Sequence, residues 1–265
     1  MTQITLEVQN ADGKVQATSS DHGQAHLAYE RPYEPGDEII LRSENKNVFM
    51  VIQLDDAMGP AFIYLTGNEY RFIIPFGEKK ISYSPKSFMG ELHALTARLA
   101  TEDEINTYKN MALNVYDQHE NETCHPHAFA NVETRGESVF AARNAINGNT
   151  LNSSHGKWPF ESWGINQRED AEITINFGRL VEIDKVALTL RADFPHDNYW
   201  ERVTLTFSDG SNQTAELVKT HLPQTILLEP KKVEWVTLKE LIKSDDPSPF
   251  PALTQIEVFG REATK

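Results

Sequence analysis

Short strand-like segments, separated by turn residues, recur along this chain and constrain its fold more strongly than any other feature. Segments such as QITLEVQ, GDEIILRS and VFMVIQL alternate apolar with polar residues or are largely apolar, and ADG, EPGD and MGP lie among them. Alternation with a period of two places successive side chains on opposite faces of a strand, while Gly, Pro and Asp favour turns. Residues 1–100 are therefore predicted to form a small β-sandwich domain, whose role the sequence leaves open.

Residues 101–123 break this pattern. Thr101 and Glu104 have the spacing of a capping box, and apolar residues follow at Ile105, Tyr108 and Met111. This spacing is typical of a helix of three or four turns with one apolar face. We therefore expect a short helical linker over residues 101–123.

Strand-like segments return over residues 124–265, where AEITINF, DKVALTL, RVTLTFS, VEWVTL and TQIEVFG follow one another. All four tryptophans of the chain also lie in this part. The predicted fold class is all-β, with two β-sandwich domains joined by the helical linker.

Four motifs follow one another in the second part: AARNAINGNT at 141–150, HGKWPFESWG at 155–164, AEITINFGRLVEIDKVAL at 171–188 and ALTQIEVFG at 252–260. Their order resembles that of the discoidin superfamily, also called coagulation-factor F5/8 type C or galactose-binding-like, which includes the family 32 carbohydrate-binding modules. The resemblance covers residues 124–262. It implies an eight-stranded jelly roll that holds a ligand on loops at one end and often contains a structural calcium ion.

The resemblance also implies the residues that would hold calcium: Asn147, Asn149, Thr150 and Glu257. Asn147 stands where the family motif has an aspartate, and the loss of this carboxylate should weaken the site, because Ca²⁺ prefers carboxylate and carbonyl oxygens. The alternative is that NGN is only a turn, formed by residues that tolerate left-handed backbone conformations. A second departure is the single cysteine, Cys124, which excludes an intrachain disulfide.

The segment RADFPHDNYWER, residues 191–202, is long for a hairpin loop and is rich in polar and aromatic side chains. In a sugar site an aromatic ring stacks on the apolar face of the sugar while polar side chains bind its hydroxyl groups. The candidate ligand-binding residues are His155, Trp158, Arg191, Asp193, His196, Asp197, Asn198, Tyr199 and Trp200. The alternative is that the aspartates cap turns and that Trp200 packs inward.

Another proline-rich segment, DDPSPFPAL at 245–253, precedes the last strand. Its prolines predict a stiff, extended connector. We expect it to brace the sandwich edge; the alternative is that it forms part of the binding rim.

The most favoured function is non-catalytic binding of a carbohydrate. One alternative is a protein–protein interaction module, with a partner possible through the N-terminal domain. A less favoured one is a metal-dependent hydrolase that uses histidines and aspartates, for which CHPH offers Cys124, His125 and His127, and His155 and His196 could join them. No HExxH, paired CxxC, GxSxG or phosphate-binding loop accompanies these residues, so we expect no catalytic residues.

The net charge of −14, without a Lys/Arg cluster, disfavours nucleic acid and anionic membranes as partners. No apolar run reaches the roughly 18 residues that a membrane-spanning helix needs. The N-terminal residues lack the features of a signal peptide, which predicts a cytoplasmic protein unless a leader was removed.

Overall fold

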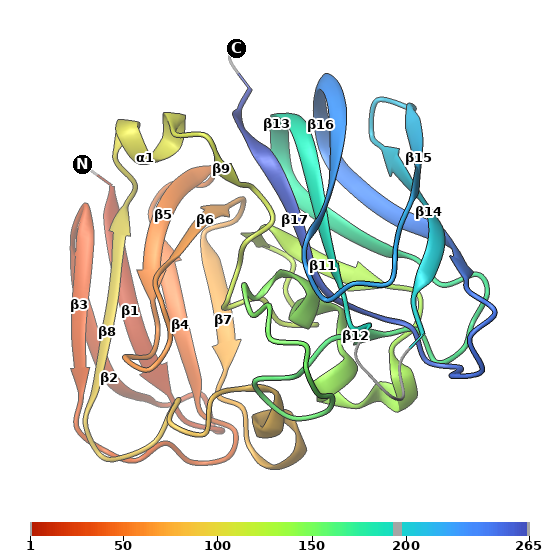
Figure 1. The fold of residues 1–265 in the computed structure, drawn as a ribbon. Coiled ribbons are helices and arrows are strands. Elements are labelled where there is room, and N and C mark those ends of the chain that lie inside the picture. The colour runs from red at the N-terminus through yellow and green to blue at the C-terminus, as the bar shows by residue number, and fades with distance from the viewer. Residues whose placement is uncertain (1, 193–197, 264–265) are drawn as a thin grey trace.

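The computed structural model describes residues 2–192 and 198–263, and it contains two antiparallel β-sandwiches side by side (Figure 1). Each sandwich has a hydrophobic core of its own. The first core runs from Ile4 to Cys124 in the sequence, and the second from Met111 to Val258. The predicted all-β fold class is confirmed.

Two sheets face each other in the N-terminal sandwich. The first has the order β2-β1-β4-β7 and contains β1 (Gln3–Gln9), β2 (Val15–His22), β4 (Glu38–Ser43) and β7 (Glu69–Ile73). The second has the order β10-β6-β5-β8-β3 and contains β3 (Gln24–Tyr29), β5 (Val48–Gln53), β6 (Ala61–Leu65), β8 (His93–Leu99) and β10 (Cys124–His125). Ile4, Leu6 and Val8 of β1 are fully buried, as the period of two predicts. A 3₁₀ turn, η1 (Gly77–Ser82), lies between β7 and β8.

The linker is less helical than predicted. The Thr101–Glu104 capping box is present, but helix α1 contains only Glu102–Asn106. Asn110 then accepts hydrogen bonds from the backbone N–H groups of Ala112 (3.0 Å) and Val258 (3.0 Å), which replace helical bonds. Strand β9 (Lys109–Asn110) consequently pairs with the last strand of the second sandwich.

The apolar residues of the linker also serve two cores instead of one helical face: Met111 packs in the second core and Tyr116 in the first. Cys124 and His125 still pair with β6, so the chain leaves the N-terminal sheet only after residue 125. No helix among the described residues is long and apolar enough to span a membrane.

The C-terminal sandwich is an eight-stranded antiparallel jelly roll with the order β12-β17-β13-β16-β14-β15; β11 joins β13 and β9 joins β17. Its strands are β11 (His127–Ala130), β12 (Trp163–Gly164), β13 (Ile173–Leu190), β14 (Trp200–Phe207), β15 (Asn212–Glu216), β16 (Gln224–Lys243) and β17 (Ala252–Glu262). Three 3₁₀ turns, η2 (Thr134–Gly136), η3 (Ser138–Phe140) and η4 (Ala142–Ile146), lie between β11 and β12.

The strand-like segments AEITINF and DKVALTL, expected to follow one another as separate strands, belong to a single long strand, β13. Asn176 Oδ1 accepts a hydrogen bond from Gly178 N (2.8 Å), and pairing with β16 is interrupted after Asn176 and resumes at Val181. This irregularity bends one long strand around the core, where two separate strands were expected.

The two sandwiches are in direct contact. Ser138 Oγ and N donate to Glu78 O (2.8 Å) and Oε1 (2.8 Å), and Trp158 N donates to Ile81 O (2.8 Å). Arg179 forms two hydrogen bonds with Glu262 (2.8 and 2.6 Å) and lies 5.2 Å from the ring centre of Phe49 in the N-terminal sandwich. Polar contacts therefore hold the loops of one sandwich against the other.

Candidate functional site

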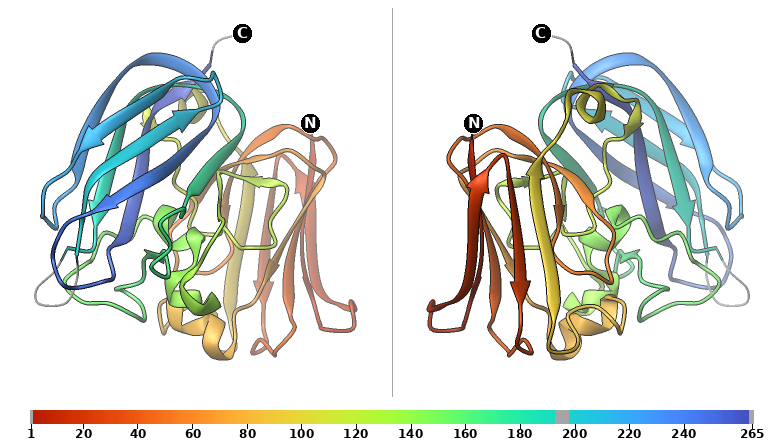
Figure 2. Two further views of the ribbon diagram at one scale, coloured as in Figure 1. Left: turned by 90° about the vertical axis from the view of Figure 1, so that its right-hand side faces the viewer. Right: turned by 90° about the vertical axis from the view of Figure 1, so that its left-hand side faces the viewer.

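A cavity of about 730 Å³ opens among the loops of the C-terminal sandwich. The turns over 134–146 and the loop before β17 lie at the same end of this sandwich (Figure 2). Three segments form the walls: the η2–η3 turns, the turn after β12, and the proline-rich segment before β17. The lining residues are Thr134, Arg135, Phe140, His155, Gly164, Ile165, Asn166, Gln167, Arg191 and 246–252.

The turn after β12 is shaped by close contact with Thr134. A Cβ atom on Gly164 would lie 2.5 Å from Thr134 Oγ1, so only glycine fits there. Thr134 Oγ1 also accepts a hydrogen bond from Asn166 N (3.0 Å). Asn166 and Gln167 then adopt left-handed conformations, with φ of 49° and 61°. These strained residues lie on the cavity wall, where strained backbone is often found at binding sites.

The proline-rich segment lines the cavity, which corrects its expected role as a brace. Asn198 holds it in place: its fully buried amide nitrogen donates to the carbonyl groups of Ser244, Asp246 and Ser248 at 2.9–3.2 Å. The amide oxygen accepts from Tyr199 N (2.7 Å) and Ser244 Oγ (2.5 Å). Asn198 was predicted to bind ligand, but its polar atoms are committed to the chain, and it positions the cavity wall instead.

Two aromatic residues of the predicted ligand loop, Tyr199 and Trp200, pack against the core. Trp200 is fully buried, with its ring centre 6.4 Å from that of Trp163 in the core, so its stacking role was wrong and the inward-packing alternative holds. Tyr199 is partly buried against the same core. Three other predicted ligand residues, Asp193, His196 and Asp197, lie outside the described residues.

Two predicted residues, His155 and Arg191, do line the cavity. His155 is exposed, whereas the Arg191 side chain is buried and its guanidinium lies 5.9 Å from the ring centre of Phe140. The sequence reading missed Phe250, a cavity-lining aromatic residue that is 45% exposed. Its position between two prolines, in PSPFP, was the signal that could have revealed a rigidly held aromatic ring.

Trp158 was also expected at the ligand site, but it lies elsewhere. Its side chain is 40% exposed and lines a separate cavity of about 140 Å³, together with residues 57–59 of the N-terminal sandwich. The hydrogen bond from Trp158 N to Ile81 O turns this part of the loop toward the other domain. His155 and Trp158 are three residues apart and yet line different cavities.

Two of the four predicted calcium residues, Asn147 and Asn149, lie in a hydrogen-bonded turn. Asn147 and Asn149 donate to Oε1 of Glu161 (2.8 and 3.0 Å), a buried carboxylate that the sequence reading did not assign. Gln255 Nε2 donates to Asn144 O (2.6 Å), Asn147 Oδ1 (2.9 Å) and Thr254 O (2.7 Å). The turn therefore has a carboxylate suited to a cation, and Glu161 Oε2 has no hydrogen-bond partner among the described residues. The Asn144 and Asn147 oxygens beside it, however, already accept hydrogen bonds from the Gln255 amide.

The other two members of that set take no part in these contacts. Thr150 is exposed, and Glu257 lies two residues beyond Gln255 on β17, where burial raises the pKa of its carboxyl group. Calcium binding stays a prediction.

The CHPH residues do not converge on a metal position. Burial raises the pKa of the Cys124 thiol, and the ring of His125 packs beneath Gly178, with Nδ1 3.3 Å from Asn176 O. His127 Nδ1 lies 2.8 Å from Asp117 Oδ1. Each side chain thus has its own structural partner, and within the described residues these three do not form a metal-binding group.

No family model matches the sequence, and no curated protein matches it. The chain is similar to several solved structures. One is chitosan-binding module 1 of a chitosanase/glucanase from Paenibacillus sp. IK-5, with 19% identity, a TM-score of 0.38, and coverage of 57% of this chain and 98% of the module. Another is the lectin domain of lectinolysin complexed with Lewis B antigen, with 20% identity, a TM-score of 0.41, and coverage of 58% and 98%.

A third similar structure is the family 32 carbohydrate-binding module of NanJ from C. perfringens in complex with galactose. It has 18% identity and a TM-score of 0.39, and the match covers 50% of this chain and 91% of the module. This module belongs to the family that the sequence motifs resemble.

Proposed function

We propose that this protein is a non-catalytic carbohydrate-binding protein that holds a sugar in the cavity at the loop end of its C-terminal sandwich. The observation that carries the proposal is the combination of an exposed aromatic ring, Phe250, with polar side chains in one cavity of about 730 Å³. A volume of this order suits a small ligand. The close packing of Gly164 on Thr134 and the hydrogen bonds of Asn198 hold the cavity walls in place in the absence of a ligand.

The cavity would bind a sugar through one apolar surface and one polar surface. The Phe250 ring offers a face on which the C–H groups of a pyranose stack, and its two flanking prolines limit the entropy that binding would cost. His155, Asn166 and Gln167 offer donors and acceptors for hydroxyl groups. Affinity for one site should be modest, because each sugar hydroxyl exchanges a hydrogen bond to water for one to protein.

A glycan array tests the proposal, with wild-type protein and two matched aromatic variants. Phe250→Ala should weaken binding about tenfold, which corresponds to about 1.4 kcal/mol, because the stacking surface is lost. Trp158→Ala removes an aromatic side chain of similar exposure that lines the other cavity, and it should bind like wild type. Circular dichroism would verify that both variants remain folded.

Two results contradict the proposal. One is a wild-type protein that binds no glycan, which would favour the protein-interaction alternative. The other is loss of binding in Trp158→Ala with retention in Phe250→Ala, which would place the sugar at the junction of the two sandwiches.

A further inference from the structure

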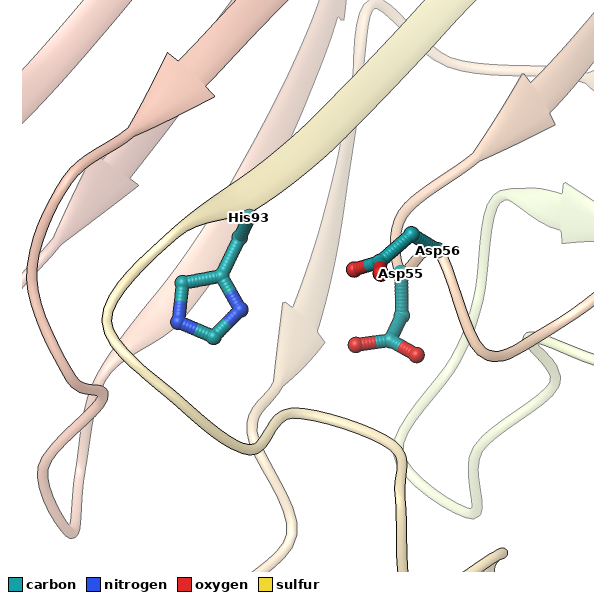
Figure 3. Close-up of side chains that lie close together, drawn as sticks. All are labelled: Asp55, Asp56 and His93. Atoms are coloured by element: carbon teal, nitrogen blue, oxygen red, sulfur yellow. The ribbon is translucent and has the colours of Figure 1, made fainter.

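Three polar side chains meet in the N-terminal sandwich, outside the cavity of the proposed function. Asp55 and Asp56 follow the end of β5, and His93 begins β8. Because β5 and β8 pair antiparallel, the end of one strand and the start of the other lie at the same edge. Figure 3 shows the His93 ring directed toward the two carboxylates, and the candidate ligand atoms of the three residues all lie within 4.8 Å of one another.

His93 is the observation that points to a ligand. Its side chain is almost fully buried, with 1% exposure, and neither ring nitrogen has a hydrogen-bond partner among the described residues. An imidazole has two nitrogens to satisfy, and leaving them buried without partners is unfavourable because they lose their hydrogen bonds to water. The nearby Tyr33 does not supply a hydrogen bond to these nitrogens. Its ring packs against the His93 ring, with the ring centres 4.2 Å apart.

Asp55 is held in a fixed orientation beside this histidine. It is 1% exposed, and its two carboxylate oxygens accept hydrogen bonds from Ala57 N (2.9 Å) and Phe88 N (2.6 Å). Phe88 adopts a left-handed conformation, with φ of 57°, in the loop that makes the second of these bonds. Each oxygen retains a lone pair, so the carboxylate can still bind a cation.

No cation of the described residues forms a direct ion pair with the cluster, although the charge of Lys80 acts on Asp55. Lys80 is a nearby cation, but its ammonium group donates to Ser87 O and lies 5.1 Å from the ring centre of Phe88. No ion pair to Asp55 or Asp56 is present among the described residues. Two carboxylates and an unpartnered imidazole therefore lie together with no described cation bonded to them.

We propose that Asp55, Asp56 and His93 form a binding site for a divalent transition metal of the zinc type. One imidazole nitrogen and two carboxylate oxygens suit Zn²⁺, whereas Ca²⁺ and Mg²⁺ select oxygen ligands. Asp56 is exposed, so the ion can reach the site from solvent. The Asp56 side chain would also have to move toward the ion, because Zn²⁺ needs bonds of about 2.0–2.2 Å to each ligand. A bound ion would give a His93 nitrogen a ligand bond and would link the end of β5 to the start of β8.

The test uses the full chain, freed of metal with a chelator and titrated with Zn²⁺ in a calorimeter and in a thermal unfolding assay. Wild type should bind one ion per chain and unfold at a higher temperature when zinc is present. Asp56→Asn should weaken zinc binding more than about tenfold, because it removes a ligand at an exposed position without disturbing the core. His93→Phe should do the same while it replaces the unsatisfied ring with an apolar one.

His26→Gln is the matched control, since His26 is an exposed histidine on β3, the strand that pairs with β8. It should keep the full zinc response. The proposal is overturned if wild type binds no zinc, or if Asp56→Asn and His93→Phe keep the wild-type affinity. It is also overturned if His26→Gln alone loses binding. None of these results depends on whether the other sandwich binds a sugar.

Discussion

Gln255 shows how one side chain can decide what a turn binds. Its amide nitrogen donates to three oxygens of the 144–149 turn and of its own strand, and its amide oxygen accepts from Gly148 N (2.9 Å). An amide can donate to oxygens that would otherwise surround a cation. A carboxylate at the same position would leave those oxygens without a donor.

We therefore expect wild-type protein to bind Ca²⁺ weakly and Gln255→Glu to bind it more tightly. In the presence of a chelator, Gln255→Glu should unfold at a lower temperature than wild type, because an unpaired buried carboxylate costs several kcal/mol. Calcium should restore much of that loss by binding the new carboxylate together with the Asn147 and Asn144 oxygens. Thermal unfolding with and without calcium checks this, and a variant that calcium does not stabilise would contradict it.

Asn198 and Trp200 make the same point about residue type. Both were assigned to ligand from their chemistry, yet one is used to hold a loop and the other fills the core. Side-chain chemistry states what a residue can contact, whereas burial decides what it does contact.

At the scale of elements, the Thr101–Glu104 capping box was sufficient to predict where helix α1 begins. Glu104 N donates to Thr101 Oγ1 (3.2 Å), and Thr101 N donates to Glu104 Oε2 (2.8 Å). The hydrogen bonds from Arg98 and from the Thr101 backbone lower the pKa of Glu104 to about 2. Because the folded-state pKa is lowered, this stabilisation is present above the unfolded value of about 4.3 and is lost as the pH falls toward about 2.

Thr101→Ala should weaken the start of α1 by about 1 kcal/mol, since it removes the cap from a five-residue helix. Hydrogen exchange of the Glu104 amide at neutral pH should accelerate about fivefold if this amide exchanges by local opening. Thr225→Ala, at an exposed position of β16, is the control and should leave exchange in α1 unchanged. Equal exchange rates in Thr101→Ala and wild type would show that the cap does not hold the helix.

The rest of the linker shows where a local pattern is insufficient. Apolar residues at helical spacing predicted one face of one helix, but Met111 and Tyr116 belong to different cores. Asn110, just before Met111, and Asn114, between the two, accept competing hydrogen bonds from nearby backbone N–H groups. A spacing rule cannot distinguish a helix from a segment that packs against two domains in turn.

At the scale of the whole molecule, the segment that crosses between the sandwiches is fastened by Asp117. Its buried carboxylate accepts from Ala128 N (2.9 Å) and Asn121 Nδ2 (2.9 Å) and lies 2.8 Å from His127 Nδ1. Burial lowers the pKa of His127, but the hydrogen bond and charge of Asp117 outweigh it, so that the pKa is raised overall. The pair therefore links stability to pH.

The direction in which stability changes with pH follows from the raised pKa of His127 in the folded state. The stabilisation is fully present below the unfolded value of about 6.5 and is lost as the pH rises through the folded value. His127→Gln should thus destabilise the protein by about 1.5–3 kcal/mol at about pH 5.5 and by less at about pH 8.5. Denaturant unfolding of wild type and variant at both values measures the difference.

The neighbouring His125 acts in the opposite direction, since burial and, to a smaller extent, the charge of His127 lower its pKa. The difference between wild type and His127→Gln therefore reports the Asp117–His127 pair together with a smaller change at His125, which no longer feels the charge of His127. A loss of stability that is equal at both pH values, or larger at the higher one, would contradict the assigned ionisation.

The sequence by itself determined the all-β class and the capping box, because period-two alternation, turn residues and helix caps act over a few residues. Only the tertiary structure decided the sites. It brought Arg191, His155 and Phe250 to one cavity, turned Trp158 toward another, and placed Asp55 and Asp56 beside His93 across paired strands. These groupings depend on strand register and loop packing between residues distant in the sequence, which no local pattern specifies.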